Sequence, residues 1–183
     1  LGLTAAGKYL YCVVGLAILA DWLRRTWPEP HPRLASLWQW LWPMAAWGGL
    51  AVSAFLLSSP YLWPVPVGRL GTSLLFHGGY ATGDHVREAA LPFWQPLVWA
   101  FSSVPWHPGV FVIAVDGLIA ALALLGIGPA RRSRSVALMW LGIGMGFLLL
   151  WPTKWAQYIV CISFPLAWVA ADGLEQRLWL PLL

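Results

Sequence analysis

Three cations stand beside long apolar runs, at places where a phosphate group at a membrane surface can be bound. Lys8 lies within the run Leu3–Ala20, Arg69 follows a proline-rich segment, and Lys154 lies in a short turn between two apolar segments. Such a cation is costly unless it reaches the interface or meets an anion. Phosphate oxygens accept charge-assisted hydrogen bonds from these groups. Tyr158, one helical turn after Lys154, would add a hydroxyl on the same face. A phosphate group is a natural partner for such cations, while solvation or lipid headgroups for Arg69 and snorkelling for Lys154 stay open as alternatives.

Asp116 is a carboxylate within the apolar stretch "VFVIAVDGLIA". Charged residues at such a depth are rare, and they normally face the inside of a helix bundle. We expect Asp116 to face protein. Two roles stay open for it: a functional one, and a structural one as a protonated or lysine-paired carboxyl group.

The histidines and cysteines show no spacing typical of a metal site or of a disulfide framework. The sequence also lacks a nucleophile elbow, a phosphate loop, a dinucleotide fingerprint and a metalloprotease helix. We therefore expect no metal and no cofactor, and no self-contained catalytic centre. The residues concerned are His31, His77, His85, His107, Cys12 and Cys161.

The composition indicates an all-α integral membrane protein. Of 183 residues, 60% are hydrophobic and only 10% are charged, whereas a soluble domain carries roughly a quarter of charged residues. The 15 tryptophans include several at the ends of apolar runs, as in the aromatic belts of membrane proteins. The net charge is +4. Its basic residues are few and lie beside apolar runs, which favours membrane orientation over nucleic-acid binding.

Five apolar segments are candidates for membrane spans, which need about 20 residues each. We expect these segments to form a single multi-span domain over residues 1–183. In the fourth segment, Gly142, Gly144 and Gly146 are expected to let a neighbouring helix pack closely. The five segments are Leu3–Ala20, Leu37–Leu57, Gly109–Ile127, Val136–Trp151 and Trp155–Ala171.

Arginines after the first, third and fifth segments predict the orientation. Basic residues favour the cytoplasmic side, so the amino terminus is expected outside the plasma membrane and the carboxyl terminus in the cytoplasm. The arginines are Arg24, Arg25, Arg33, Arg131, Arg132, Arg134 and Arg177.

The segment Ser58–Pro108 is expected to lie on the outer membrane surface. It begins with "SSPYLWPVPVGRL", whose prolines must end the preceding helix. We expect a short interfacial helix over Gly68–His77, a loop over Gly78–Glu88, and a re-entrant or interfacial helix within Leu91–Pro105.

Four phrases in this order resemble the middle and carboxyl-terminal part of the protein O-mannosyltransferase and aminoarabinose-transferase superfamily. These are integral membrane glycosyltransferases of the C-type fold. The most specific parts are the Pro-Tyr-Leu-Trp-Pro corner and the run that carries Lys154, Tyr158 and Pro165. The phrases cover Ala5–Ala20, Ser59–Leu70, Leu91–Pro105 and Pro152–Gly173.

The resemblance implies transfer of a sugar from a polyprenyl-phosphate donor to a protein or lipid hydroxyl. It assigns Lys8, Arg69 and Lys154 to the donor phosphate, where positive charge would stabilise the leaving group. The family's catalytic acid lies in the first external loop, which would precede Leu1, so the catalytic residue is expected upstream.

The alternative is a non-catalytic accessory subunit of a larger respiratory or photosynthetic membrane complex, a role that tryptophans and small-residue helices suit equally well. The expected partners are membrane lipids, a polyprenyl-phosphate sugar and other membrane subunits, without nucleic acid.

Overall fold

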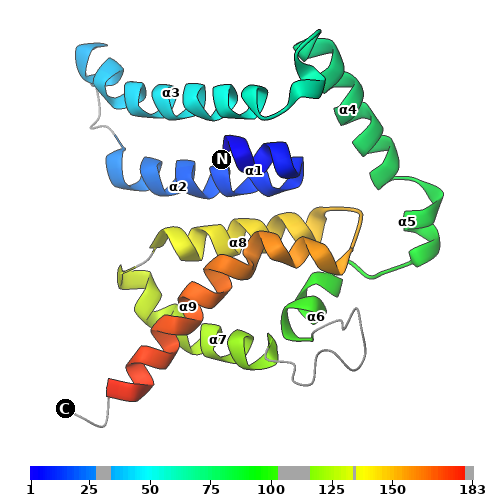
Figure 1. Cartoon of the computed structure of the whole chain (residues 1–183). Coiled ribbons are helices and arrows are strands. Elements are labelled where there is room, and N and C mark those ends of the chain that lie inside the picture. Colours follow the sequence, from blue (N-terminus) through cyan, green and yellow to red (C-terminus); the bar gives the residue numbers. More distant parts are fainter. Residues whose placement is uncertain (28–33, 103–115, 134, 180–183) are drawn as a thin grey trace. The chain divides into compact units, whose positions relative to one another are not determined.

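The computed structural model describes residues 1–27, 34–102, 116–133 and 135–179, and these residues form helices without any strand (Figure 1). The expected all-α class is confirmed. Contacts divide the chain into two compact units, Leu1–Ala81 and Thr82–Leu183. The boundary lies inside the segment predicted for the outer membrane surface. The single-domain arrangement stays a prediction.

The described part of the first unit consists of three helices of 13 to 24 residues and three shorter elements. The short α1 packs on α3. Trp40 on α3 also donates a hydrogen bond from its indole Nε1 to the hydroxyl of Thr26 on α2. The elements are α1 (Gly2–Gly7), η1 (Tyr9–Val13), α2 (Val14–Thr26), α3 (Leu34–Leu57), η2 (Pro60–Leu62) and α4 (Pro66–Ala81).

The first predicted span, Leu3–Ala20, is not one helix, and this prediction was wrong in that respect. Gly7 ends α1, and Lys8 adopts an extended backbone with φ −162° and ψ 122°. A glycine is a common stop for a helix. The chain then restarts as a 3₁₀ helix from Tyr9. The apolar pattern did not reveal this interruption, since the residues on both sides of Lys8 are equally suited to a membrane helix.

The described part of the second unit contains five α-helices and one 3₁₀ helix, and Figure 1 shows how they are arranged. Its core lies where α7 crosses α9, with small buried residues such as Ala123, Ala130 and Ala170. The elements are α5 (Asp84–Ala89), α6 (Gln95–Phe101), α7 (Asp116–Ser133), α8 (Ser135–Leu150), η3 (Ala156–Ile159) and α9 (Val160–Trp179).

Among the residues that the structure describes, two segments are long and apolar enough to cross a membrane, Ser36–Leu57 and Ala156–Glu175. None of the apolar window in the first segment is buried by the rest of the protein, so this helix is not a core helix of the first unit. The apolar helix α8 has 16 residues, about 24 Å, which is shorter than the bilayer core. The predicted count of five spans stays a prediction, and residues 109–115 of the third span lie outside the described residues.

The predicted loop Gly78–Glu88 was wrong, whereas helical structure on either side of it is confirmed; the place of these helices at the membrane surface stays a prediction. Helix α4 continues to Ala81, and α5 begins at Asp84 after Gly83. A carboxylate in the first turn interacts favourably with the helix dipole, and Asp84 also pairs with Arg87 at 3.1 Å. These local interactions favour helix in a stretch whose polar composition indicates a loop.

Of the three glycines expected to permit close helix packing, Gly144 does so and the other two do not. A Cβ on Gly144 would lie 2.6 Å from the Cγ2 of Ile162, so this close approach is confirmed. A Cβ on Gly142 or Gly146 would meet nothing within 4 Å, so the prediction was wrong for both.

Candidate functional site

The proline-rich corner after α3 is held by its own aromatic side chains. The helix ends at Leu57, and Pro60 opens η2. The indole Nε1 of Trp63 donates a hydrogen bond of 2.7 Å to the Leu56 carbonyl, which also accepts one of 3.2 Å from the backbone N–H of Ser59. Carbonyls at a helix end lack their usual partners within the helix. Leu62 is buried, with 1% of its surface exposed. The predicted helix stop is confirmed, and the corner is held in place by the Trp63 hydrogen bond and the buried Leu62 side chain.

Arg69 on α4 folds back over this corner. Its Nη1 donates a 2.5 Å hydrogen bond to the Tyr61 carbonyl, and its guanidinium lies 4.9 Å from the centre of the Tyr61 ring. Arginine has five N–H donors, so Arg69 keeps further donors for a ligand in addition to its hydrogen bond to Tyr61. Arg69 has no ion pair with any carboxylate in the described part of the chain. A phosphate group can therefore be bound there without breaking an ion pair.

Lys8 is half-buried at the break between α1 and η1, and its ammonium lies 5.8 Å from the centre of the Tyr11 ring. The next residue, Tyr9, contacts α4. Its ring lies 5.4 Å from that of His77, and its hydroxyl accepts a 3.2 Å hydrogen bond from Ser73. The sequence analysis missed this contact, because no spacing relates residues so far apart.

The most buried ion pair of the first unit is another feature that the sequence analysis missed. Asp21, of which 9% is exposed, pairs with Arg25 at 2.7 Å and with Arg24 at 3.4 Å. The i,i+3 and i,i+4 spacings would have indicated it. The charge of these two arginines, which the orientation prediction uses, is therefore offset in part by Asp21.

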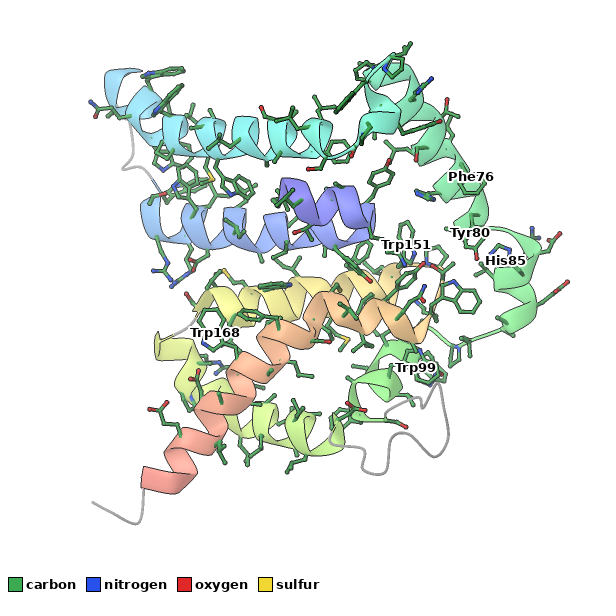
Figure 2. All side chains as sticks on the ribbon, in the orientation of Figure 1. Phe76, Tyr80, His85, Trp99, Trp151 and Trp168 are labelled. Carbon is green, nitrogen blue, oxygen red and sulfur yellow. The ribbon has the colours of Figure 1, made fainter. Side chains whose placement is uncertain are left out.

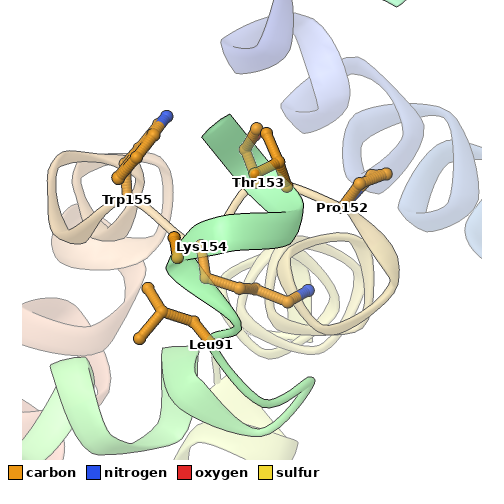
Figure 3. Close-up of a pocket in the computed structure, with 7 residues that line it drawn as sticks. Leu91, Pro152, Thr153, Lys154 and Trp155 are labelled. Atoms are coloured by element: carbon orange, nitrogen blue, oxygen red, sulfur yellow. The ribbon is translucent and has the colours of Figure 1, made fainter. Parts of the chain in front are cut away.

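Lys154 is buried at the carboxyl-terminal end of α8, with 7% of its surface exposed. Its Nζ donates hydrogen bonds to the carbonyls of Leu148 at 2.8 Å, Leu149 at 2.9 Å, and Trp151. Figure 3 shows the side chain extending across the end of the helix. Burial lowers the pKa of Lys154 from its ordinary value, because the charged form loses hydration. The structure thus directs this ammonium into the protein.

The turn around Lys154 is polar and closely packed. Thr153 donates a 3.4 Å hydrogen bond to the hydroxyl of the buried Tyr158, and Trp99 on α6 donates from Nε1 to the Lys154 carbonyl at 3.1 Å (Figure 2). A cavity between this turn and α5 and Leu91 has about 10 Å³, and a single water needs roughly that volume. The cavity is too small for a sugar or a phosphate group.

Asp116 is the first residue of α7 and is partly exposed. The neighbouring Gly117 lies against the end of α6, where a Cβ would be 3.3 Å from the Phe101 carbonyl. Residues 103–115, which precede Asp116, lie outside the described residues, so its predicted position within a longer span stays a prediction.

The predicted site residues belong to both units. Lys8 and Arg69 lie in the first unit, whereas Lys154, Tyr158 and Asp116 lie in the second, where Lys154 and Tyr158 share one turn. Within the described ranges, no three His, Cys, Asp or Glu side chains come together as metal ligands. Comparison with protein-family models, with curated proteins and with solved structures finds no match to this chain.

Proposed function

We propose that this chain is the carboxyl-terminal, membrane-embedded portion of a glycosyltransferase that takes a sugar from a polyprenyl-phosphate donor and transfers it to a protein or lipid hydroxyl. The catalytic acid would belong to a part of the enzyme upstream of Leu1. In this proposal the protein lies in the plasma membrane. The arginine pattern sets its orientation and places its carboxyl terminus in the cytoplasm.

The observation that carries the proposal is an arginine on α4 that folds back over the corner after an apolar helix of membrane-spanning length. Helix α3 has 24 residues, about 36 Å, enough to cross a bilayer. Directly after it, the corner that resembles the glycosyltransferase family holds Arg69 by one hydrogen bond to Tyr61. A guanidinium at this level is suited to a lipid-linked phosphate, because the lipid chain would lie along the membrane core.

The cations differ in how well they suit this role. Arg69 keeps further N–H donors and is partly exposed. Lys154 donates to three carbonyls, as many as its ammonium has protons, and a phosphate would have to displace one of them. We therefore assign the donor phosphate to Arg69, with Lys8 as a further candidate.

Binding of polyprenyl phosphate tests the proposal without requiring the catalytic part. The 183-residue chain in lipid nanodiscs is titrated with polyprenyl phosphate, and Arg69→Gln is compared with Arg87→Gln. Arg87 is exposed and pairs with Asp84, so its replacement serves as the matched control. We expect Arg69→Gln to weaken binding by about tenfold or more, as for loss of a charged hydrogen-bond donor. Equal affinity for both variants would contradict the assignment, and absence of binding by the unmodified chain would contradict the function.

The accessory-subunit alternative is favoured by a different observation. No residue in the apolar window of α3 is fully buried, and the helix exposes Trp38, Trp42 and Leu50. A neighbouring subunit could cover this face as well as lipid could. Copurification of a stable partner that covers α3, without binding of polyprenyl phosphate, would support this alternative.

A further inference from the structure

The end of α8 leaves carbonyl groups without the backbone donors that a longer helix would supply. In an α-helix the N–H of residue i donates to the carbonyl of residue i−4. The N–H of Trp151 still meets the Phe147 carbonyl at 2.8 Å. The next donor would come from residue 152, which is a proline and has no N–H. The Leu148 carbonyl therefore lacks its backbone partner.

The Lys154 ammonium takes the place of these missing donors. Its Nζ lies 2.8 Å from the Leu148 carbonyl and 2.9 Å from the Leu149 carbonyl, and it also contacts that of Trp151. The positive charge lies at the carboxyl-terminal end of the helix, where the helix dipole favours a cation. Three acceptors match the three N–H bonds of an ammonium group in number.

We propose that these three carbonyls form an ammonium-binding site, and that Lys154 is its built-in ligand and the residue that positions the 152–158 turn. The site selects for N–H donors as well as for charge. This inference goes beyond the proposed function and does not depend on it, since it concerns the carbonyls of Leu148, Leu149 and Trp151 alone.

The site connects three elements of the second unit. The Lys154 side chain reaches back to α8, while its own carbonyl accepts the bond from Trp99 on α6. The hydroxyl of the preceding residue, Thr153, donates a hydrogen bond to the hydroxyl of Tyr158 in η3. Loss of the ammonium would therefore release the turn from α8 and loosen the positions of α6 and η3 as well.

Chemical labelling of the unmodified chain provides the first test. The sequence contains only two lysines, Lys8 and Lys154, so acetylation by an amine-reactive reagent can be assigned by mass spectrometry. We expect acetylation of Lys154 in the folded chain to be slower than in the unfolded chain by about tenfold or more, and slower than acetylation of the less buried Lys8. Equal rates for Lys154 in the folded and unfolded chains would overturn the proposal.

Chemical rescue tests the selectivity of the site. The thermal unfolding temperature of Lys154→Ala, purified in detergent, is measured with added ammonium, methylammonium or tetramethylammonium chloride at equal ionic strength. We expect the first two salts to raise it relative to the third, which carries the charge without any N–H donor. The unmodified chain, whose site is filled, is the control and should show no such difference. An equal response of Lys154→Ala to all three salts would overturn the proposal. If this variant does not fold, the labelling experiment decides alone.

Discussion

Gly126 on α7 and Gly173 on α9 face each other where the two helices cross. A Cβ placed on Gly126 would lie 2.9 Å from the nitrogen of Gly173, and a Cβ on Gly173 would lie 2.9 Å from the nitrogen of Gly126. Each would also overlap a backbone carbonyl of the other helix, that of Val169 or of Leu122. Only hydrogen atoms on both Cα atoms allow this approach, which is the type of packing that small residues permit in membrane helices.

Replacement of Gly126 by alanine should separate α7 from α9. Because the atoms in the way belong to the backbone, no side chain can rotate to make room, and we expect the free energy of unfolding to fall by about 1–3 kcal/mol or more. Thermal unfolding in detergent measures this change. Gly128 lies on the same helix, where a Cβ would meet nothing within 4 Å. Gly128→Ala is therefore the control, and equal unfolding temperatures for the two variants would refute the close crossing.

The carboxylate of Asp21 should stabilise the first unit more than the similar carboxylate of Asp84 stabilises the second. The Asp21 side chain is 12% exposed and pairs with Arg24 and Arg25, whereas that of Asp84 is 83% exposed and pairs with Arg87. We expect Asp21→Asn to lower the free energy of unfolding by about 1–3 kcal/mol, and Asp84→Asn by about 0.5 kcal/mol or less. Denaturation curves of both variants compare them. A larger loss for Asp84→Asn would contradict the role given to burial.

The indole of Trp140 should stabilise the α8–α9 contact because of a proline in α9. Pro165 has no N–H for the Cys161 carbonyl, and the Nε1 of Trp140 donates to that carbonyl instead at 2.8 Å. We expect Trp140→Phe to lower the free energy of unfolding by about 1–3 kcal/mol, since a buried acceptor loses its donor.

A double-mutant cycle separates this hydrogen bond from the loss of aromatic packing. Pro165→Ala restores a backbone N–H that can donate to the Cys161 carbonyl within the helix. Trp140→Phe should therefore cost less stability in the Pro165→Ala background than in the unmodified chain. Equal costs in both backgrounds would show that the indole contributes through packing alone.

Helix α3 should enter the membrane, and a charge near its middle should oppose insertion. Leu50 is 72% exposed, so Leu50→Arg would place its guanidinium in lipid at a cost of about 2.5–3.5 kcal/mol. The fraction of chains that resists alkaline extraction from membranes should fall. Leu75, which is 78% exposed on α4, gives the control Leu75→Arg, where the charge would reach the membrane surface. An equal effect of both variants would contradict the predicted depths.

The sequence by itself determined the helical class, the length of α3 and its end before Pro60, because composition and the missing N–H of proline act locally. It also indicated that Lys154 and Arg69 need acceptors or anions. Only the tertiary structure decided which groups they meet: the carbonyls at the end of α8 for Lys154, and that of Tyr61 for Arg69. Only the tertiary structure likewise decided that Gly126 lies at a close helix crossing. Hydropathy treats all glycines alike, whereas the one that permits a close crossing is selected by the angle and register at which two helices pack.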